Sequence, residues 1–176
     1  MEAIARRIVL TGPECSGKTT LAGELARHYD APWVPEYARE YATALERPLV
    51  YADVEPIARG QRAAEDAASR SGRLLLLDTD LLSTVVYSRY CYGACPAWIE
   101  REAVARLGDL YLLHQPDIPW VAEPGLREAS DRRAEQSKLF RDALAASGAT
   151  VVEIRGAWPE RLAKAIAAID ERLGRP

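Results

Sequence analysis

The chain has 176 residues, 48% of them hydrophobic and 28% charged, which is the balance of an ordinary soluble globular protein with enough mass to bury a core. Its net charge of −3 argues against a protein that holds nucleic acid through bulk electrostatics. No segment resembles a signal peptide or approaches the length of a membrane span, so we expect a cytoplasmic protein without membrane or nucleic-acid partners. The three cysteines form no recognisable zinc or disulfide framework, and the sequence predicts no oligomeric state.

Short apolar runs alternate with segments of helical pattern along the chain. The predicted strands are Ile8–Thr11, Trp33–Pro35, Leu74–Asp78, Leu110–His114 and Thr150–Ile154. The predicted helical stretches are Lys18–Tyr29, Glu36–Ser71, Asp80–Leu107, Ser130–Ala146 and Pro159–Leu173, of which the second and third each hold a pair of helices. This alternation predicts an α/β fold in three α/β/α layers around a five-stranded parallel sheet, as a single domain over residues 1–176.

The stretch GPECSGKTT, residues 12 to 20, lies between the first strand and the first helix and matches the pattern G-x-x-x-x-G-K-[ST]. The glycines let backbone N–H groups wrap an anion at a helix N-terminus, which is typical of a P-loop. We expect Lys18 to reach the β- and γ-phosphates of ATP and the Thr19 hydroxyl to bind Mg²⁺. The predicted nucleotide contacts in this loop are Gly12, Pro13, Glu14, Cys15, Ser16, Gly17, Lys18, Thr19 and Thr20.

Two aspartates end the third predicted strand. Asp78 lies at the carboxyl end of a buried strand, where open α/β sheets bind their ligands, so it is a candidate for holding Mg²⁺. Asp80 either contacts the substrate or is the N-cap of the next helix.

The segment VPEYAREY supplies a second group of candidates after the second predicted strand. Glu36 would face the γ-phosphate and accept the proton of an attacking hydroxyl, while Tyr37 and Arg39 would contact the substrate. The alternative is a simple surface ion pair between Glu36 and Arg39, which are one helical turn apart.

Residues 115–133 are predicted to form a lid, because three prolines and a glycine separate a strand from a helix there. Arg127, Arg132 and Arg133 could close over the transferring phosphate, or lie at a solvated helix start. Trp120 could stack on an aromatic base or pack beneath the lid.

Trp158, after the last strand, could border the adenine, although a packing tryptophan at a helix start is the alternative that we favour. His28 and His114 have no catalytic partner in an obvious arrangement, and we interpret both as structural.

The motifs GPECSGKTTLA, EYARE, GQR at 60–62, LLDTDLLST and WVAEPGLR occur in the order in which one known family carries them. In this combination the chain resembles the ribosylnicotinamide kinase domain at the C-terminus of bacterial NadR proteins, over residues 8 to about 145. The resemblance implies a P-loop NTPase fold of the nucleoside and nucleotide kinase type. It also implies ATP-dependent phosphorylation of the 5′-hydroxyl of nicotinamide riboside, which gives nicotinamide mononucleotide and ADP.

The same resemblance implies roles for individual residues. The motif match places Gly17, Lys18 and Thr19 on ATP and Mg²⁺, Glu36 and Arg39 on the riboside, Asp78 on the metal and Arg127 on the phosphates. The DNA-binding and adenylyltransferase regions of NadR proteins precede the kinase domain. Since the P-loop starts at residue 12 here, neither activity is assigned to this chain.

Two alternatives to a nicotinamide riboside kinase stay open. The acceptor could be another nucleoside or a nucleotide, or the chain could be a P-loop ATPase or regulatory NTP switch. The base-recognition pattern N-K-x-D of a switch is absent from the sequence, and an acid after the second strand together with lid arginines favours transfer to a bound acceptor. The sequence leaves open whether Glu36, Asp78 or Asp80 takes the proton, and whether GTP can replace ATP.

Overall fold

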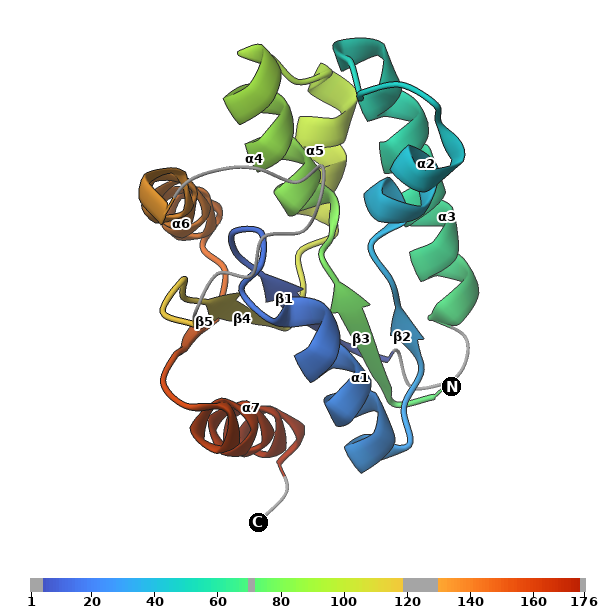
Figure 1. Cartoon of the computed structure of the whole chain (residues 1–176). Coiled ribbons are helices and arrows are strands. Elements are labelled where there is room, and N and C mark those ends of the chain that lie inside the picture. The colour runs from blue at the N-terminus through green and yellow to red at the C-terminus, as the bar shows by residue number, and fades with distance from the viewer. Residues whose placement is uncertain (1–4, 70–71, 119–129, 175–176) are drawn as a thin grey trace.

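The computed structural model describes residues 5–69, 72–118 and 130–174 (Figure 1). The strands are β1 (Arg6–Thr11), β2 (Trp33–Val34), β3 (Leu74–Asp78), β4 (Leu110–His114) and β5 (Val151–Ile154). The helices are α1 (Lys18–Tyr29), α2 (Tyr37–Ala44), the short 3-10 helix η1 (Tyr51–Asp53), α3 (Val54–Ala68), α4 (Leu81–Tyr92), α5 (Ala97–Ala105), α6 (Ser130–Ser147) and α7 (Trp158–Leu173).

The five strands form one sheet in the order β2-β3-β1-β4-β5, and every neighbouring pair is parallel. The predicted five-stranded parallel sheet is therefore confirmed. β2 is shorter than predicted, because only Trp33 and Val34 pair with β3 before the chain turns into α2. The two predicted helix pairs are also present, as α2 with α3 and as α4 with α5.

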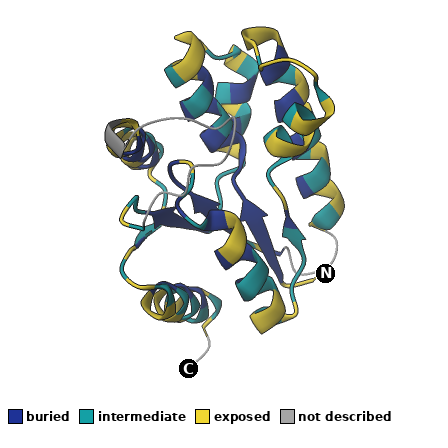
Figure 2. Cartoon of the chain, viewed as in Figure 1, coloured by how far each residue is buried: buried dark blue, intermediate teal, exposed yellow. Residues whose placement is uncertain are grey.

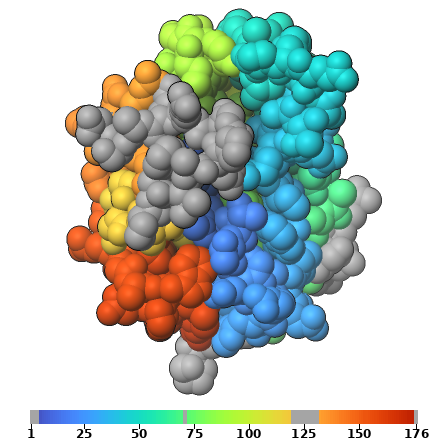
Figure 3. Space-filling view, in the orientation of Figure 1, coloured from blue at the N-terminus to red at the C-terminus, as the bar shows by residue number. Residues whose placement is uncertain are grey.

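Helices cover both faces of the sheet. On one face α1 and α7 pack against side chains such as Ile8 and Leu112, and the two helices lie side by side in Figure 3. On the other face α3, α4, α5 and α6 pack against side chains such as Val9 and Leu77. Successive strand residues point to opposite faces. A strand covered on both sides must therefore be apolar throughout, and Figure 2 shows the central strands fully buried.

The strand order brings the predicted site residues to one edge of the sheet. β1 lies between β3 and β4, and Leu10 near the end of β1 pairs with Asp78 at the end of β3. β2 ends beside β3, two residues before Glu36. Because all strands are parallel, the loop after β1, the end of β3 and the start of α2 meet at the carboxyl edge, where open α/β sheets bind ligands.

Within the residues that the structure describes, no helix has both the length and the apolar character needed to cross a membrane.

Candidate active site

The loop between β1 and α1 has a conformation that depends on glycine. Gly12 and Gly17 have φ values of +129° and +85°, and Cys15 also has a positive φ of 51°. A Cβ on Gly12 would lie 2.6 Å from the backbone oxygen of His114, so no larger residue fits there without a shift of β4. The Gly17 backbone caps the start of α1 in the left-handed region that glycine tolerates. The loop therefore has the local geometry predicted for a P-loop.

Lys18 is buried at the start of α1, and its ammonium lies within the loop. Nζ donates hydrogen bonds to the backbone oxygens of Pro13 at 2.7 Å and of Gly12 at 3.1 Å. Burial lowers the pKa of Lys18, and the nearby carboxylates of Glu36 and Asp78 partly oppose that shift. Phosphate oxygens bound in the loop would stabilise this buried positive charge.

Thr19 and Asp78 form a pair beside the loop. The Thr19 hydroxyl donates a 2.6 Å hydrogen bond to Oδ2 of Asp78. Asp78 is buried, its Oδ1 has no hydrogen-bond partner, and burial raises its pKa. A hydroxyl and a free carboxylate oxygen are ligands that suit Mg²⁺, which proteins commonly bind through one or two carboxylates with substrate phosphates completing the shell. The Thr19 hydroxyl and the unpartnered Oδ1 of Asp78 fit that requirement.

Glu36 immediately precedes α2, and its side chain is 23% exposed. Its Oε2 lies 3.8 Å from Nε of Arg39, whose side chain is 59% exposed, so the ion pair considered as the alternative is present but long. Burial raises the pKa of Glu36, while the Lys18 ammonium lowers it. Tyr37 packs its ring against Gly60 of α3, and its predicted contact with substrate stays a prediction.

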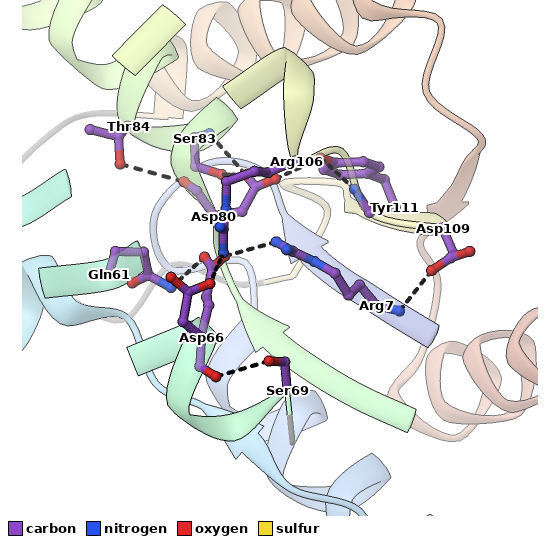
Figure 4. A network of polar contacts seen from close by, with 12 residues as sticks. Arg7, Gln61, Asp66, Ser69, Asp80, Ser83, Thr84, Arg106, Asp109 and Tyr111 are labelled. Carbon is purple, nitrogen blue, oxygen red and sulfur yellow. Dashed lines mark hydrogen bonds and ion pairs between the residues drawn. The ribbon is translucent and has the colours of Figure 1, made fainter. Parts of the chain in front are cut away.

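Asp80 is the N-cap of α4, which was the alternative considered for it. Its Oδ1 accepts a hydrogen bond from the backbone N–H of Ser83 at 3.1 Å, and its Oδ2 accepts one from the Tyr111 hydroxyl at 2.6 Å. Figure 4 shows Asp80 turned toward Tyr111. Both carboxylate oxygens of Asp80 are therefore bonded inside the fold, as its N-cap position requires, and its contact with substrate stays a prediction.

Three cavities meet at Glu36. The largest, of about 530 Å³, runs along the P-loop and is lined by Glu14–Thr20 on one side and by α2 on the other. A second, of about 180 Å³, lies between α2, α3 and α4. A third, of about 410 Å³, includes Thr19 and Asp78. Because Glu36 lines all three, it lies where the nucleotide loop, the candidate metal ligands and a separate pocket come together.

The lid prediction is only partly covered by the described residues. Arg133, at the start of α6, is buried, and its Nη2 donates to the backbone oxygens of Ile118 at 3.3 Å and of Cys15 at 3.4 Å. One predicted lid arginine thus lies against the P-loop, whereas Arg132 is exposed. Arg127 and Trp120 lie outside the described residues, and the lid stays a prediction.

Trp158 is the first residue of α7 and packs beside the P-loop. A Cβ on Gly17 would lie 3.0 Å from the Trp158 ring, and the indole N–H donates to the Glu24 carboxylate of α1 at 3.1 Å. The packing interpretation is therefore present in the structure, at a position adjoining the nucleotide loop.

Arg161 of α7 is a site residue that the sequence reasoning missed. The side chain is completely buried, and its guanidinium donates to the backbone oxygens of Ser16, Gln115 and Gly156 and to the Asp117 carboxylate. It therefore ties the P-loop to the segment after β4. The signal was available, because the buried positions of α7 are Arg161, Ala165 and Ile169, a spacing of four that places a charged residue on an apolar stripe.

His114 supports the loop from the same side, as the structural interpretation predicted. Its Nδ1 lies 3.0 Å from the backbone oxygen of Ser16, the side chain is fully buried, and burial lowers its pKa to about 3. A free histidine has a pKa of about 6.5. Between these values the unfolded chain binds a proton that the folded chain excludes, so this histidine removes stability as the pH falls.

We expect His114→Gln to weaken the acid sensitivity of the fold. From pH 7 to pH 5 the wild type should lose about 2 kcal/mol more unfolding free energy than the variant, at about 1.4 kcal/mol per unit below pH 6.5. Urea unfolding of both proteins at the two pH values measures this difference. The amide of glutamine preserves a donor to Ser16, and parallel pH curves for the two proteins would contradict the expectation.

Comparison with known families identifies the chain. A family model described as "AAA domain" matches residues 7–161, which include the P-loop, Glu36 and Asp78. The chain belongs to the AAA domain family. Membership agrees with a nucleotide-binding role for the loop after β1, the element on which the site is built.

Within the AAA domain family, this chain is similar to NadR. It is 28% identical over 178 residues to the trifunctional NAD biosynthesis/regulator protein NadR of Salmonella typhimurium, over 96% of this chain and 43% of that protein. It thus spans less than half the length of that relative. Crystal structures of NadR protein in complex with NR, and in complex with NAD and AMP-PNP, superimpose with TM-scores of 0.77 and 0.79 at 26% and 27% identity. Each covers 98% of this chain and 51% of the NadR chain. The resemblance seen in the motifs is confirmed.

A more distant structure shows the fold class of this AAA domain chain. Thymidylate kinase from Ehrlichia chaffeensis superimposes with a TM-score of 0.68 at 13% identity, over 94% of this chain and 98% of the kinase. The chain therefore has the P-loop fold of nucleoside and nucleotide kinases, as the sequence predicted.

Proposed function

We propose that this protein is an ATP-dependent kinase that phosphorylates the 5′-hydroxyl of nicotinamide riboside. The observation that carries the proposal is the position of Glu36, which lines both the P-loop cavity and the separate pocket between α2, α3 and α4. A carboxylate at such a junction can touch an acceptor hydroxyl and face the γ-phosphate together. The similarity to NadR, one structure of which holds NR and another AMP-PNP, supports the choice of both substrates.

The P-loop would hold the triphosphate of ATP. Its backbone N–H groups and the Lys18 ammonium would bind the β- and γ-phosphates, and Arg133 beside the loop would add charge at the same anion. Thr19 and Asp78 would hold Mg²⁺ with the phosphate oxygens. When bound, Mg²⁺ neutralises charge that develops on the phosphates during transfer.

Transfer then requires one proton acceptor. The 5′-oxygen of the acceptor attacks the γ-phosphorus, forming a new P–O bond. The bond between the γ-phosphorus and its bridging oxygen breaks, and ADP leaves with that electron pair. The hydroxyl proton passes to the Glu36 carboxylate. Burial raises the pKa of Glu36, which makes it a stronger base than an exposed glutamate.

The pocket between α2, α3 and α4 has the chemistry of a site for a cationic aromatic base. Among its described lining residues, Glu14, Glu36 and Asp53 carry carboxylates and none is Lys, Arg or His. Asp53 is already paired with Arg47, so Glu14 and Glu36 set the local potential. Tyr87 and Tyr92 also line the pocket, and aromatic rings attract cations. Nicotinamide riboside carries a positively charged pyridinium, whereas the common nucleosides are neutral.

An acceptor panel tests the proposed function. ADP release would be measured with ATP and Mg²⁺ in the presence of nicotinamide riboside, nicotinic acid riboside, adenosine, uridine or thymidine, with mass spectrometry of the acceptor. We expect nicotinamide mononucleotide as the main product. The neutral nucleosides and the carboxylate-bearing riboside should react at least about tenfold more slowly, since about 1.4 kcal/mol of unfavourable electrostatics suffices for that ratio.

Two other outcomes of the panel would contradict the proposal in different ways. Faster phosphorylation of a neutral nucleoside would keep the kinase and replace its substrate. ADP release that does not depend on any acceptor would indicate an ATPase or a regulatory NTP switch.

A further inference from the structure

The start of α2 lacks the features that usually fix a helix N-terminus. Glu36 occupies the N-cap position, but its side chain makes no capping hydrogen bond, and none of the α2 residues is buried. An N-cap residue normally uses its own side chain to accept a hydrogen bond from a free N–H of the first turn. A glutamate that did so here would turn its carboxylate away from the cavities that it lines.

Two consecutive residues of α3 supply the capping hydrogen bond and the packing contact that the start of α2 does not make by itself. The Gln61 Oε1 accepts a 3.0 Å hydrogen bond from the backbone N–H of Tyr37, the first residue of α2. The Tyr37 ring covers Gly60 so closely that any Cβ there would overlap it. The GQR segment at 60–62 therefore fixes the backbone and the side chain of the residue that follows Glu36.

A buried ionic network sets the orientation of the Gln61 amide. Gln61 Nε2 donates to Oε1 of Glu65 at 3.1 Å, and Glu65 Oε2 accepts from Arg7 of β1 at 2.7 Å, with Arg106 at 3.5 Å. Figure 4 shows the guanidinium groups of Arg7 and Arg106 converging beside Gln61. Gln61 and Glu65 are 2% and 1% exposed, so water does not compete. The Glu65 carboxylate can accept a hydrogen bond only from the side-chain nitrogen of Gln61. The side-chain oxygen of Gln61 is therefore the atom that faces the Tyr37 N–H.

We propose that Gln61 is a positioning residue that caps α2 from the neighbouring helix and thereby leaves the Glu36 carboxylate free at the junction of the cavities. The inference rests on the proposed role of Glu36 as base. On this inference, Gly60 and Gln61 hold α2 in register with the P-loop, and the Arg7–Glu65 ion pair holds Gln61 in place.

The first test replaces Gln61 with methionine, which keeps the volume and removes both hydrogen bonds. We expect kcat for phosphorylation of nicotinamide riboside to fall about 10- to 100-fold, because a shift of about 1 Å in a reacting group has an effect of that size. KM for ATP should stay within about twofold, since the P-loop is untouched. Hydrogen exchange across Tyr37–Ala44 should become faster in the variant. Gln61→Ala replaces it if the methionine variant does not fold.

The second test exchanges the two partners, in the double variant Gln61→Glu with Glu65→Gln. The exchange keeps the net charge, preserves an acceptor for the Tyr37 N–H, and leaves the new amide at 65 able to donate to position 61 and accept from Arg7. We expect it to restore kcat to within about threefold of wild type and to restore slow exchange in α2, while Gln61→Glu alone stays impaired by like-charge repulsion with Glu65.

Tyr29→Phe is the matched control. It removes two part-buried interhelical hydrogen bonds, which the Tyr29 hydroxyl donates to the Ile166 backbone oxygen and to the Asp170 carboxylate, both at 3.1 Å. They lie at the end of α1 farthest from the P-loop, so the variant tests for a general loss of stability. Its kcat should equal that of wild type.

Failure of this inference can be told apart from failure of the proposed function. A wild-type protein that phosphorylates no acceptor refutes the proposed function, and exchange in α2 would still report whether Gln61 caps that helix. An active wild type with unchanged kcat and unchanged exchange in Gln61→Met refutes the positioning role. A double variant in which slow exchange of α2 is restored but kcat stays as low as in Gln61→Glu alone would also refute it. Gln61 lines the proposed acceptor pocket, and that result would indicate that it acts by direct contact with the acceptor.

Discussion

Lys18→Met is expected to lower kcat for phosphoryl transfer by at least about 10²- to 10³-fold, the loss typical when one charged stabiliser of a transition state is removed. Methionine keeps the buried stem of the side chain and removes only the ammonium that lies among the backbone oxygens of the loop. Burial lowers the pKa of Lys18, so the charge is held against a desolvation cost. We therefore expect the thermal unfolding midpoint without nucleotide to be unchanged or higher. Steady-state kinetics and thermal unfolding measure the two effects.

Lys138→Met is the control for that variant. Lys138 lies on α6 with its side chain 73% exposed and pairs only with Asp142 among the interactions described for it. The same chemical change there should leave kcat unaltered. A Lys18→Met enzyme within about threefold of wild-type kcat would show that the P-loop ammonium does not stabilise the transferring phosphate, contrary to its expected role.

Glu36→Gln is the second substitution that we expect to lower kcat strongly. We expect kcat to fall about 10²- to 10⁴-fold, the range associated with loss of a general base, while nucleotide affinity changes little. In wild type, kcat/KM for the acceptor should fall as the pH drops through the pKa of Glu36, because a protonated carboxyl cannot accept the proton. Burial raises that pKa, so the decline should start above the ordinary range near pH 4.3. The variant should lack this limb of the pH profile.

Glu46→Gln makes the same change at an exposed glutamate just after α2 and should leave both kcat and the pH profile unchanged. Unchanged turnover in Glu36→Gln would remove the assignment of the base and leave Asp78 as the next candidate, since both oxygens of Asp80 are bonded within the fold.

The proposed base and its positioning residue also explain why α2 can be so lightly attached. The helix buries none of its residues, and its register depends on contacts with α3. An element held by few contacts opens at low free energy, which is common where substrates must enter. The rate of hydrogen exchange across α2 therefore reports directly whether Gln61 caps this helix.

The sequence by itself determined the local features of this protein. The P-loop is a contiguous pattern whose two glycines have positive φ here, and the strands are short apolar runs whose side-chain period is fixed by backbone geometry. Most of the predicted lid, including Arg127 and Trp120, lies outside the described residues. The observed strand boundaries differ from the predicted ones where pairing with a strand distant in the sequence decides which residue ends the strand, as in the short β2.

Only the tertiary structure decided which distant residues meet. Arg161 donates a hydrogen bond to Ser16, which is 145 residues away in the sequence. Gln61 accepts one from Tyr37, 24 residues away, and Asp80 accepts one from Tyr111, 31 residues away. Sequence reasoning could not assign these contacts, because a hydrogen-bonding side chain carries no local sign of its partner. The partner follows from the strand order, the packing of α3 and α7 on opposite faces of the sheet, and the cost of leaving a buried polar group unpaired.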